Sequence, residues 1–281
     1  MKKLYRKKLI LVLSLGFISV ILIVMLQTSF KTKPSVLESY DNTDSFFTDT
    51  ILTQTGIPEA VFDELTESQK EYILEHLEKD SEYAGFASRG YTMDSATGNL
   101  IPMNLTDSEP DLTLSVIVFK ESISEREETN EYCYNVMPSF VWNRAVKVKN
   151  DSLACAVYSG WETTGEQNLR LYLKNAEGQQ VQHVDISGIY PSCFGYGFRI
   201  PGDTGFVSGF YEGCAYFHME KKEADTAVEI VMQYVHDTSL RCRAFYGVDI
   251  GEETISITEF SDNDIKMLSD IFKMEMNTGQ K

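Results

Sequence analysis

The sequence predicts a mainly β exported domain behind one transmembrane helix, with antiparallel strands arranged as a two-sheet sandwich or a barrel-like closure. An uncharged apolar run at residues 9–30 follows a basic octet, which is the pattern of a membrane-crossing helix. From Leu112 onward apolar and polar residues alternate with period two, in ten runs separated by turn residues. So many short strands most simply bury one face each by packing two sheets or by closing a barrel.

Residues 1–8 are expected to form a cytoplasmic tail and residues 9–30 an uncleaved signal anchor. The tail carries five basic residues, against two just after the span, which places the N-terminus in the cytoplasm. A cleavable signal peptide has a shorter apolar centre and ends in a pair of small residues, and no such pair occurs between Val24 and Phe30. We therefore expect a single-pass protein of the cell membrane, with residues 9–30 in the lipid bilayer and residues 31–281 outside the cytoplasm.

The charge of the exported part excludes several classes of function. All 42 Asp and Glu residues lie beyond residue 30, with 20 of the 25 Lys and Arg residues, so residues 31–281 carry a formal charge of −22. A surface of this sign repels phosphate backbones, and nucleic acid is not an expected ligand. The eight cytoplasmic residues leave no room for a kinase or a DNA-binding domain.

Residues 31–55 are polar and lack periodicity, so we expect a stalk or linker. Residues 56–110 are expected to hold a helical hairpin and a connecting segment. The second helix carries a capping-box pattern at Thr66 and Gln69. A helical hairpin this short seldom forms a site by itself, so we expect it to dock on the main domain. Its apolar positions are Val61, Leu65, Tyr72, Ile73 and Leu77.

Residues 111–281 are expected to form the β-rich domain and to close with a helix at residues 265–276. An N-cap within Ser261–Asp264 precedes this helix, and Ile265, Leu268, Ile271 and Phe272 would form its apolar stripe. The ten strand-like runs are residues 112–119, 139–148, 152–160, 168–174, 181–188, 192–200, 205–217, 227–235, 240–250 and 254–258.

Cysteines occur only in the exported part, where disulfides can persist. Zinc binding is disfavoured because no Cys-x-x-Cys pair occurs. Cys155 and Cys242 lie on leucine-bearing faces of their strands and are expected in the core, and the state of Cys133 is left open. The remaining two cysteines are Cys193 and Cys214.

Cys193 and Cys214 flank the turn at residues 201–205. If Asp203 and Thr204 form a two-residue hairpin loop, every glycine of the hairpin faces a larger residue and Cys193 faces Cys214 directly. Directly opposed side chains lie close to disulfide geometry. We therefore predict that these two cysteines are bridged or lie adjacent as thiols.

Two short motifs could carry chemistry, and both have simpler explanations. Asp203-Thr204-Gly205 matches the tripeptide of aspartic proteases, but Pro201-Gly202 precedes it and Phe206 follows, so a turn is favoured. Asp262-Asn263-Asp264 resembles the start of a calcium loop without the later glycine and glutamate, and a helix cap explains it.

The four histidines have no spacing typical of a metal site. A carboxylate-oriented imidazole would pair His183 with Asp185 or His218 with Glu220, because each pair shares a strand face. The other two histidines are His76 and His236. A surface or structural role is favoured for all four, and we predict no catalytic residue, no metal site and no cofactor.

One aromatic stripe could form a ligand platform. Phe194, Tyr196 and Phe198 alternate with glycines, so the three rings project from one face of a strand. That face is either part of the core, which burial statistics favour, or an exposed platform for a neutral glycan or a peptide.

These patterns together predict a membrane-anchored binding module rather than an enzyme. Its partner would be a glycan, a peptide or another membrane protein. Two alternatives stay open: an anchored cell-surface hydrolase whose catalytic carboxylates come from separate strands, and an accessory subunit of a membrane transporter.

Overall fold

A computed structural model divides the chain into two units, residues 1–36 and 37–281, and all the residues that it describes lie in the second. The predicted tail, the anchor at residues 9–30 and most of the stalk lie outside the described residues. No helix in the described part is long and apolar enough to cross a membrane. The described residues are 55–78, 80–96, 100–103, 109–122, 132–146, 150–157, 161–175, 179–186, 188–192, 195–201, 209–221, 228–236, 246–251, 254–259 and 272–276.

The helix pair that the sequence predicts is confirmed as α3 (Glu59–Glu64) and α4 (Glu67–His76). The capping box is also present. The Thr66 hydroxyl accepts from the backbone N–H of Gln69, and the Gln69 side chain accepts from the backbone N–H of Thr66. These two bonds satisfy N–H groups that the first turn of a helix leaves without partners, so they fix where α4 begins.

Two antiparallel sheets make up most of the remaining structure, and a two-stranded sheet joins β12 (Tyr246–Gly251) to β13 (Thr254–Glu259). The seven-stranded sheet has the order β2-β1-β3-β4-β10-β6-β7, and the five-stranded sheet the order β14-β11-β5-β9-β8. The strands of the larger sheet are β1 (Glu82–Met93), β2 (Leu100–Pro102), β3 (Leu112–Ser122), β4 (Tyr132–Trp142), β6 (Trp161–Lys174), β7 (Gln180–Ile186) and β10 (Phe210–Lys221). Those of the smaller sheet are β5 (Asn150–Val157), β8 (Gly188–Ser192), β9 (Gly195–Pro201), β11 (Val228–Val235) and β14 (Phe272–Met276).

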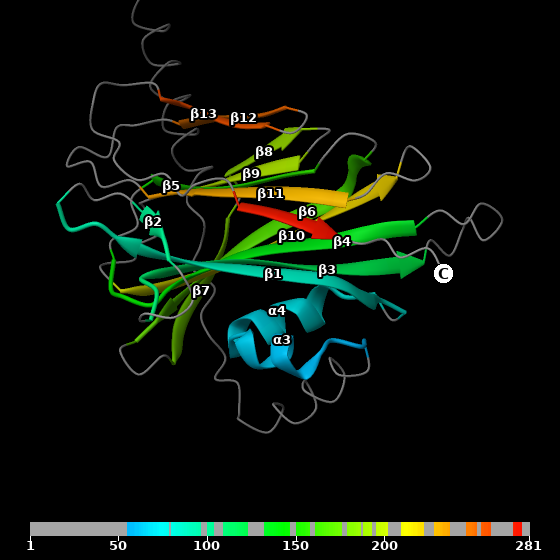
Figure 1. The fold of residues 1–281 in the computed structure, drawn as a ribbon, viewed down its shortest axis with the longest axis horizontal. Coiled ribbons are helices and arrows are strands. Elements are labelled where there is room, and N and C mark those ends of the chain that lie inside the picture. The colour runs from blue at the N-terminus through cyan, green and yellow to red at the C-terminus, as the bar shows by residue number, and fades with distance from the viewer. Residues whose placement is uncertain are drawn as a thin grey trace, which may run out of the picture. The chain divides into compact units, whose positions relative to one another are not determined.

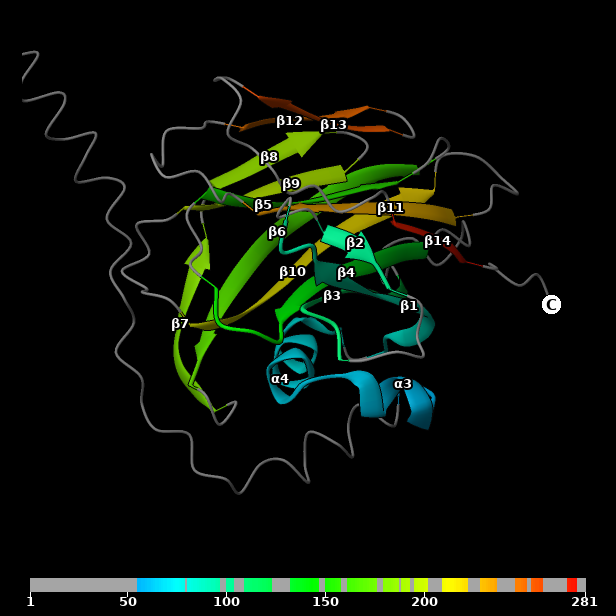
Figure 2. The same ribbon diagram turned by 60° about the vertical axis from the view of Figure 1, so that its left-hand side comes forward.

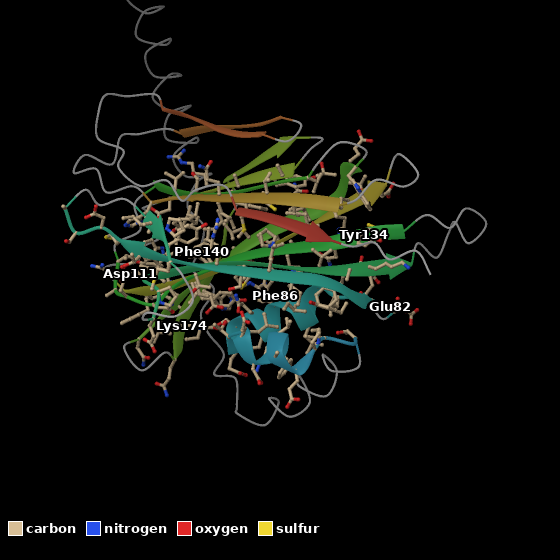
Figure 3. The ribbon with its side chains drawn as sticks, in the orientation of Figure 1. Glu82, Phe86, Asp111, Tyr134, Phe140 and Lys174 are labelled. Carbon is tan, nitrogen blue, oxygen red and sulfur yellow. The ribbon has the colours of Figure 1, made fainter. Side chains whose placement is uncertain are left out.

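The two larger sheets pack face to face, which confirms the sandwich. Alternate residues of the seven-stranded sheet, such as Val116 and Phe140, lie in one cluster with Leu153, Phe198 and Met232 of the five-stranded sheet. Figure 1 shows the five-stranded sheet on one side of the seven-stranded sheet and both helices on the other side. The same layers are visible after rotation in Figure 2. In Figure 3 the Phe140 ring lies between the sheets.

The C-terminal helix predicted at residues 265–276 is wrong over its last five residues. Residues 272–276 form β14, which pairs antiparallel with β11, and residues 260–271 lie outside the described part. The sequence Phe-Lys-Met-Glu-Met alternates apolar and polar residues, so its period fits a strand as well as a helix. The open edge of β11 offers a full ladder of backbone hydrogen bonds, and pairing there decides between the two.

Residues 56–110 contain more than the predicted helices and connection. β1 and β2 add to the edge of the seven-stranded sheet, with Phe86 of β1 opposite Ile117 of β3. One face of β1 contributes Ala84 and Ala87 to the inter-sheet core, and the other places Phe86 against the helices. Both faces are partly covered, so the simple alternation that marks a strand is lost.

The predicted hairpin, with its loop at Asp203 and Thr204 and with Cys193 opposite Cys214, is wrong. β9 pairs with β5 and β8, whereas β10 pairs with β4 and β6, so the two strands belong to different sheets. Gly213 does face a large residue, as predicted, but that residue is Phe140, and a Cβ atom at position 213 would lie 2.1 Å from the Phe140 ring. Any neighbouring strand can cover a glycine in this way, so glycine cover does not identify the partner strand.

Candidate functional site

The aromatic stripe lies in the core. Phe198 is fully buried and Tyr196 is 5% exposed, and the Tyr196 ring centroid lies 5.2 Å from that of Phe217 in the opposite sheet. Phe194 lies outside the described residues. The platform hypothesis is therefore wrong for Tyr196 and Phe198, and the alternative of a core position holds.

The described cysteines are free thiols. Cys214 is buried on the outer face of β10, beneath α4, and Cys193 and Cys242 lie outside the described residues. Of the two predicted alternatives, the Cys193–Cys214 disulfide is therefore not formed, whereas the adjacency of two thiols involves Cys193 and lies outside the described residues. Cys155 is fully buried between the sheets, as predicted, and burial raises its pKa. Cys133 is half-buried, and burial, together with Glu121 and Glu220, raises its pKa to about 12.

The outer face of the seven-stranded sheet is covered by the helix pair. Leu65, Tyr72 and Ile73 of the helical segment contact apolar residues of four strands, which confirms that the helices dock on the main domain. The Tyr72 hydroxyl also donates to the backbone carbonyl of Asn168. The sheet residues of this cluster are Ile117, Phe119, Met137, Tyr172, Cys214 and Tyr216.

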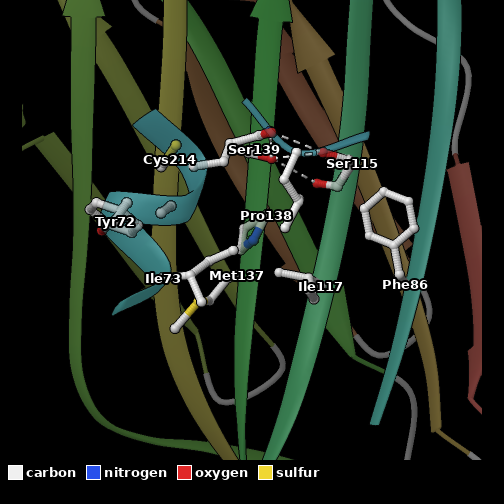
Figure 4. Close-up of a pocket in the computed structure, with 12 residues that line it drawn as sticks. Tyr72, Ile73, Phe86, Ser115, Ile117, Met137, Pro138, Ser139 and Cys214 are labelled. Carbon is white, nitrogen blue, oxygen red and sulfur yellow. Dashed lines mark hydrogen bonds between the residues drawn. The ribbon is translucent and has the colours of Figure 1, made fainter. Parts of the chain in front are cut away.

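Polar contacts hold the N-terminal end of α4. The Thr66 hydroxyl donates to one oxygen of Glu212, a fully buried carboxylate on β10, and the ammonium group of Lys174 pairs with the other. The Gln69 amide donates to the hydroxyls of Ser139 and Ser115, at 2.8 and 3.4 Å. Figure 4 shows the two serines side by side on neighbouring strands.

The C-terminal end of α4 is held in the same way. Arg170 of β6 makes a bidentate pair with Glu75, at 2.5 and 3.1 Å, and donates to Asp185 of β7 at 2.8 Å. This guanidinium lowers the pKa of Glu75. The Asn135 amide donates to the backbone carbonyl of His76, an acceptor that the helix end leaves without an internal partner.

A small pocket remains between α4 and the sheet (Figure 4). Its free volume has room for about one water molecule. Apolar side chains such as Ile73 and Met137 line it together with Gln69 and Ser139. The Phe86 ring of β1 also borders the pocket.

A second polar cluster lies between the sheets. Asp151 of β5 is fully buried, and one of its oxygens accepts from the Tyr234 hydroxyl at 2.6 Å and lies 2.7 Å from Nδ1 of His236. The Trp142 indole N–H donates to the Tyr234 hydroxyl at 3.1 Å, which joins β4 of one sheet to β11 of the other. Burial and the charge of Asp151 raise the pKa of Tyr234 well above its ordinary value, and that of Tyr211 to about 12.

A third cluster lies on the outer face near the ends of β3 and β10. The buried carboxylate of Glu121 accepts from Asn135 at 3.2 Å and from Ser81 at 3.3 Å, and it lies 3.2 Å from Nε2 of His218. A carboxylate-oriented imidazole, which the sequence offered within single strands as the less favoured alternative, is thus formed between strands instead. The partners are Glu121 for His218 and Asp151 for His236, whereas Asp185 pairs with Arg170.

The buried carboxylates do not converge. Asp151 lies between the sheets, Glu212 beneath the start of α4, and Glu121 at another position of the outer face, and each is paired with its own cationic or imidazole group. Within the described residues, no group of three or more His, Cys, Asp and Glu side chains could hold a metal ion. The Asp203-Thr204-Gly205 and Asp262-Asn263-Asp264 motifs lie outside the described part.

The sequence did not predict that Asp151, Glu212 and Glu121 are buried and hold neighbouring side chains in place. Asp151 directly precedes the strand predicted at residues 152–160, although it already lies in β5. Glu212 lies on the same strand face as Cys214 and Tyr216, which are buried. A charged residue on an otherwise buried face was the one sign in the sequence that Glu212 is paired. Its partners come from α4 and β6, which strand periodicity alone does not place.

No family model matches the chain, and no curated protein matches it. Among solved structures it is similar to the collagen-binding domain of a Staphylococcus aureus adhesin, at 9% identity, over 56% of this chain and 93% of that chain, with a TM-score of 0.27. It is also similar to the collagen-binding domain of the Erysipelothrix rhusiopathiae surface protein RspB, at 5% identity over 58% and 61%, with a TM-score of 0.29. The KRT10-binding region domain of the pneumococcal protein PsrP gives 9% identity over 64% and 98%, with a TM-score of 0.25. TM-scores this low carry no argument about function.

Proposed function

We propose that this chain is a membrane-anchored extracytoplasmic binding module. The observation that favours binding over hydrolysis is the separation of its buried carboxylates. A carboxylate hydrolase needs two such groups facing one substrate, about 5–10 Å apart in glycosidases. Asp151, Glu212 and Glu121 instead lie in three clusters, each bonded to neighbours that it holds in place. Their role in this proposal is to stabilise the sandwich and the docked helices.

The anchor in this proposal is residues 9–30. The support is the basic octet, the length of the uncharged run and the absence of a small-residue pair at its end. The partner is a glycan, a peptide or another membrane protein that meets the exported domain outside the cytoplasm.

Fractionation of cells that express the full chain tests the anchor. We expect the protein to stay with the membranes through washing at high salt, and its C-terminal region to be cleaved by protease added to intact cells. A soluble form that begins near residue 29 would contradict the anchor. As a matched variant, Leu26→Ala combined with Thr28→Ala creates an Ala-x-Ala pair and should promote release.

Cross-linking of intact cells, followed by purification of the full chain, tests the binding role. A binding module should be recovered with a reproducible partner outside the cytoplasm. Recovery with the subunits of one transporter would support the accessory-subunit alternative instead. Turnover of a cell-surface polymer by the purified chain, abolished by changing a single exposed carboxylate, would contradict the proposal.

A further inference from the structure

The helix pair has a hydrophobic core of its own. The apolar residues of α3, α4 and the outer sheet face form one cluster, and the inter-sheet residues form another that shares no member with it. The inter-sheet core would therefore keep all its buried members if the helices moved away from the sheet.

Beside this apolar cluster, polar contacts that water can replace hold the helices. No residue of α3 is buried, and the buried residues of α4 include Ser68, Gln69 and Lys70 beside Tyr72 and Ile73. Hydrogen bonds and ion pairs fasten α4 at both ends, through Thr66 and Gln69 at its start and Glu75 and His76 at its end. Interfaces of this mixed polarity are typical of parts that move relative to one another within a chain.

A small pocket also lies between α4 and the sheet, with room for about one water molecule. Local openings occur where few apolar contacts and many replaceable polar contacts join a segment to the rest of a protein. The helix pair meets this description better than any part of the inter-sheet core.

We propose that α3 and α4 form a lid that opens as a unit from the outer face of the seven-stranded sheet while the sandwich stays folded. The structure is the closed state. Opening would uncover an apolar strip that runs across β3, β4, β10 and β6, made of Ile117, Phe119, Met137, Tyr172 and Tyr216. This inference does not depend on the membrane anchor.

Two buried thiols report on the two cores separately. Cys214 lies beneath α4 and is 3% exposed, and Cys155 lies between the sheets and is fully buried. Opening of the lid exposes Cys214 alone, whereas global unfolding exposes both. Isotope-coded alkylation of the full chain in detergent, with site-by-site mass spectrometry, measures both rates in one sample.

We expect Cys214 to be alkylated at least tenfold faster than Cys155 in the absence of urea. The Cys214 rate should respond only weakly to low urea, because lid opening exposes less surface than global unfolding. A bulky maleimide and small iodoacetamide should give the same preference, which distinguishes lid opening from diffusion of a small reagent through the pocket. Equal rates at both thiols, or a preference seen only with iodoacetamide, would overturn the proposal.

A matched pair of variants locates the opening at the lid. Arg170 pairs with Glu75 of α4 and with Asp185 of β7, so each carboxylate can be removed singly. Glu75→Gln should accelerate alkylation of Cys214 about twofold to fivefold and leave Cys155 unchanged, as expected for loss of one partly exposed ion pair. Asp185→Asn should change neither rate. Acceleration of Cys155 by Glu75→Gln would mean that the helices and the sandwich open together, against the proposal.

Discussion

The two faces of the seven-stranded sheet are buried in different ways. The inner face meets the five-stranded sheet through aliphatic and aromatic side chains, with Asp151 and its bonded neighbours as a polar exception. The outer face meets the helices through a smaller apolar cluster bordered by Gln69, Glu212 and Arg170. Apolar burial supplies most of the free energy of folding, and polar contacts supply little beyond their desolvation cost. We therefore expect contacts at the inner face to contribute most of the free energy of folding, and contacts at the outer face to break more easily.

The largest expected effect comes from the inner face. Phe198→Ala removes a fully buried ring from the inter-sheet core and should lower the free energy of unfolding by about 3–5 kcal/mol. Thermal or urea unfolding of the purified chain measures it. Phe86→Ala is the matched change on the helix side, where the ring is only partly buried, and should cost clearly less. Equal losses would remove the distinction between the two faces.

A smaller effect is expected at the start of α4. Thr66→Ala removes the N-cap hydroxyl and its bond to Glu212, and should cost about 1 kcal/mol, the usual value for a lost cap. Because the change acts on the lid, alkylation of Cys214 should accelerate while that of Cys155 should not. Thr66→Ser keeps the hydroxyl and serves as the control. If Thr66→Ala accelerated alkylation of Cys214 and Cys155 equally, the result would contradict two separate cores.

The smallest effect is expected at Glu71, and it is stabilising. Burial, and then the charges of Glu67 and Glu212, raise its pKa above the ordinary value of 4.5. The folded state therefore holds this proton more tightly than the unfolded state, and the ionised group costs stability as the pH rises above that value. Glu71→Gln should raise stability at pH 7 by about 0.2–0.5 kcal/mol, the usual size of one like-charge contact on a helix, and the gain should vanish in acid. A gain that persists at pH 3 would contradict this origin.

The strands were predictable where the chain is deeply buried and therefore mostly apolar. Residues 114–119 of β3 and 151–157 of β5 are buried throughout, on both faces of their strands, and runs of apolar residues predicted both strands. β1 was not predicted because its residues, such as Phe86 and Ala87, are mostly only partly buried and form no such apolar run. Local sequence patterns do not show that two helices fold back over one face of β1.

Strand partners were less predictable than strands. The Cys193–Cys214 hairpin rested on glycines facing larger residues, and Phe140 of β4 meets that need at Gly213 as well as a hairpin neighbour would. The polar clusters were not predicted for the same reason: the carboxylate considered for His218 was Glu220 of its own strand, whereas the one beside it is Glu121 of β3. Side chains that meet across sheets are set by topology, which local periodicity does not encode.

The position of β10 has a consequence for how the chain folds as it is made. β10 lies between β4 and β6, and it is the last strand of the seven-stranded sheet along the sequence. Until Phe210–Lys221 has been synthesised, β2-β1-β3-β4 and β6-β7 are two separate half-sheets with no shared hydrogen-bond ladder. At roughly 5–20 residues per second, the growing chain exposes both half-sheet edges for seconds. β10 must then insert between two existing edges rather than add to one. We expect errors in strand pairing at this step.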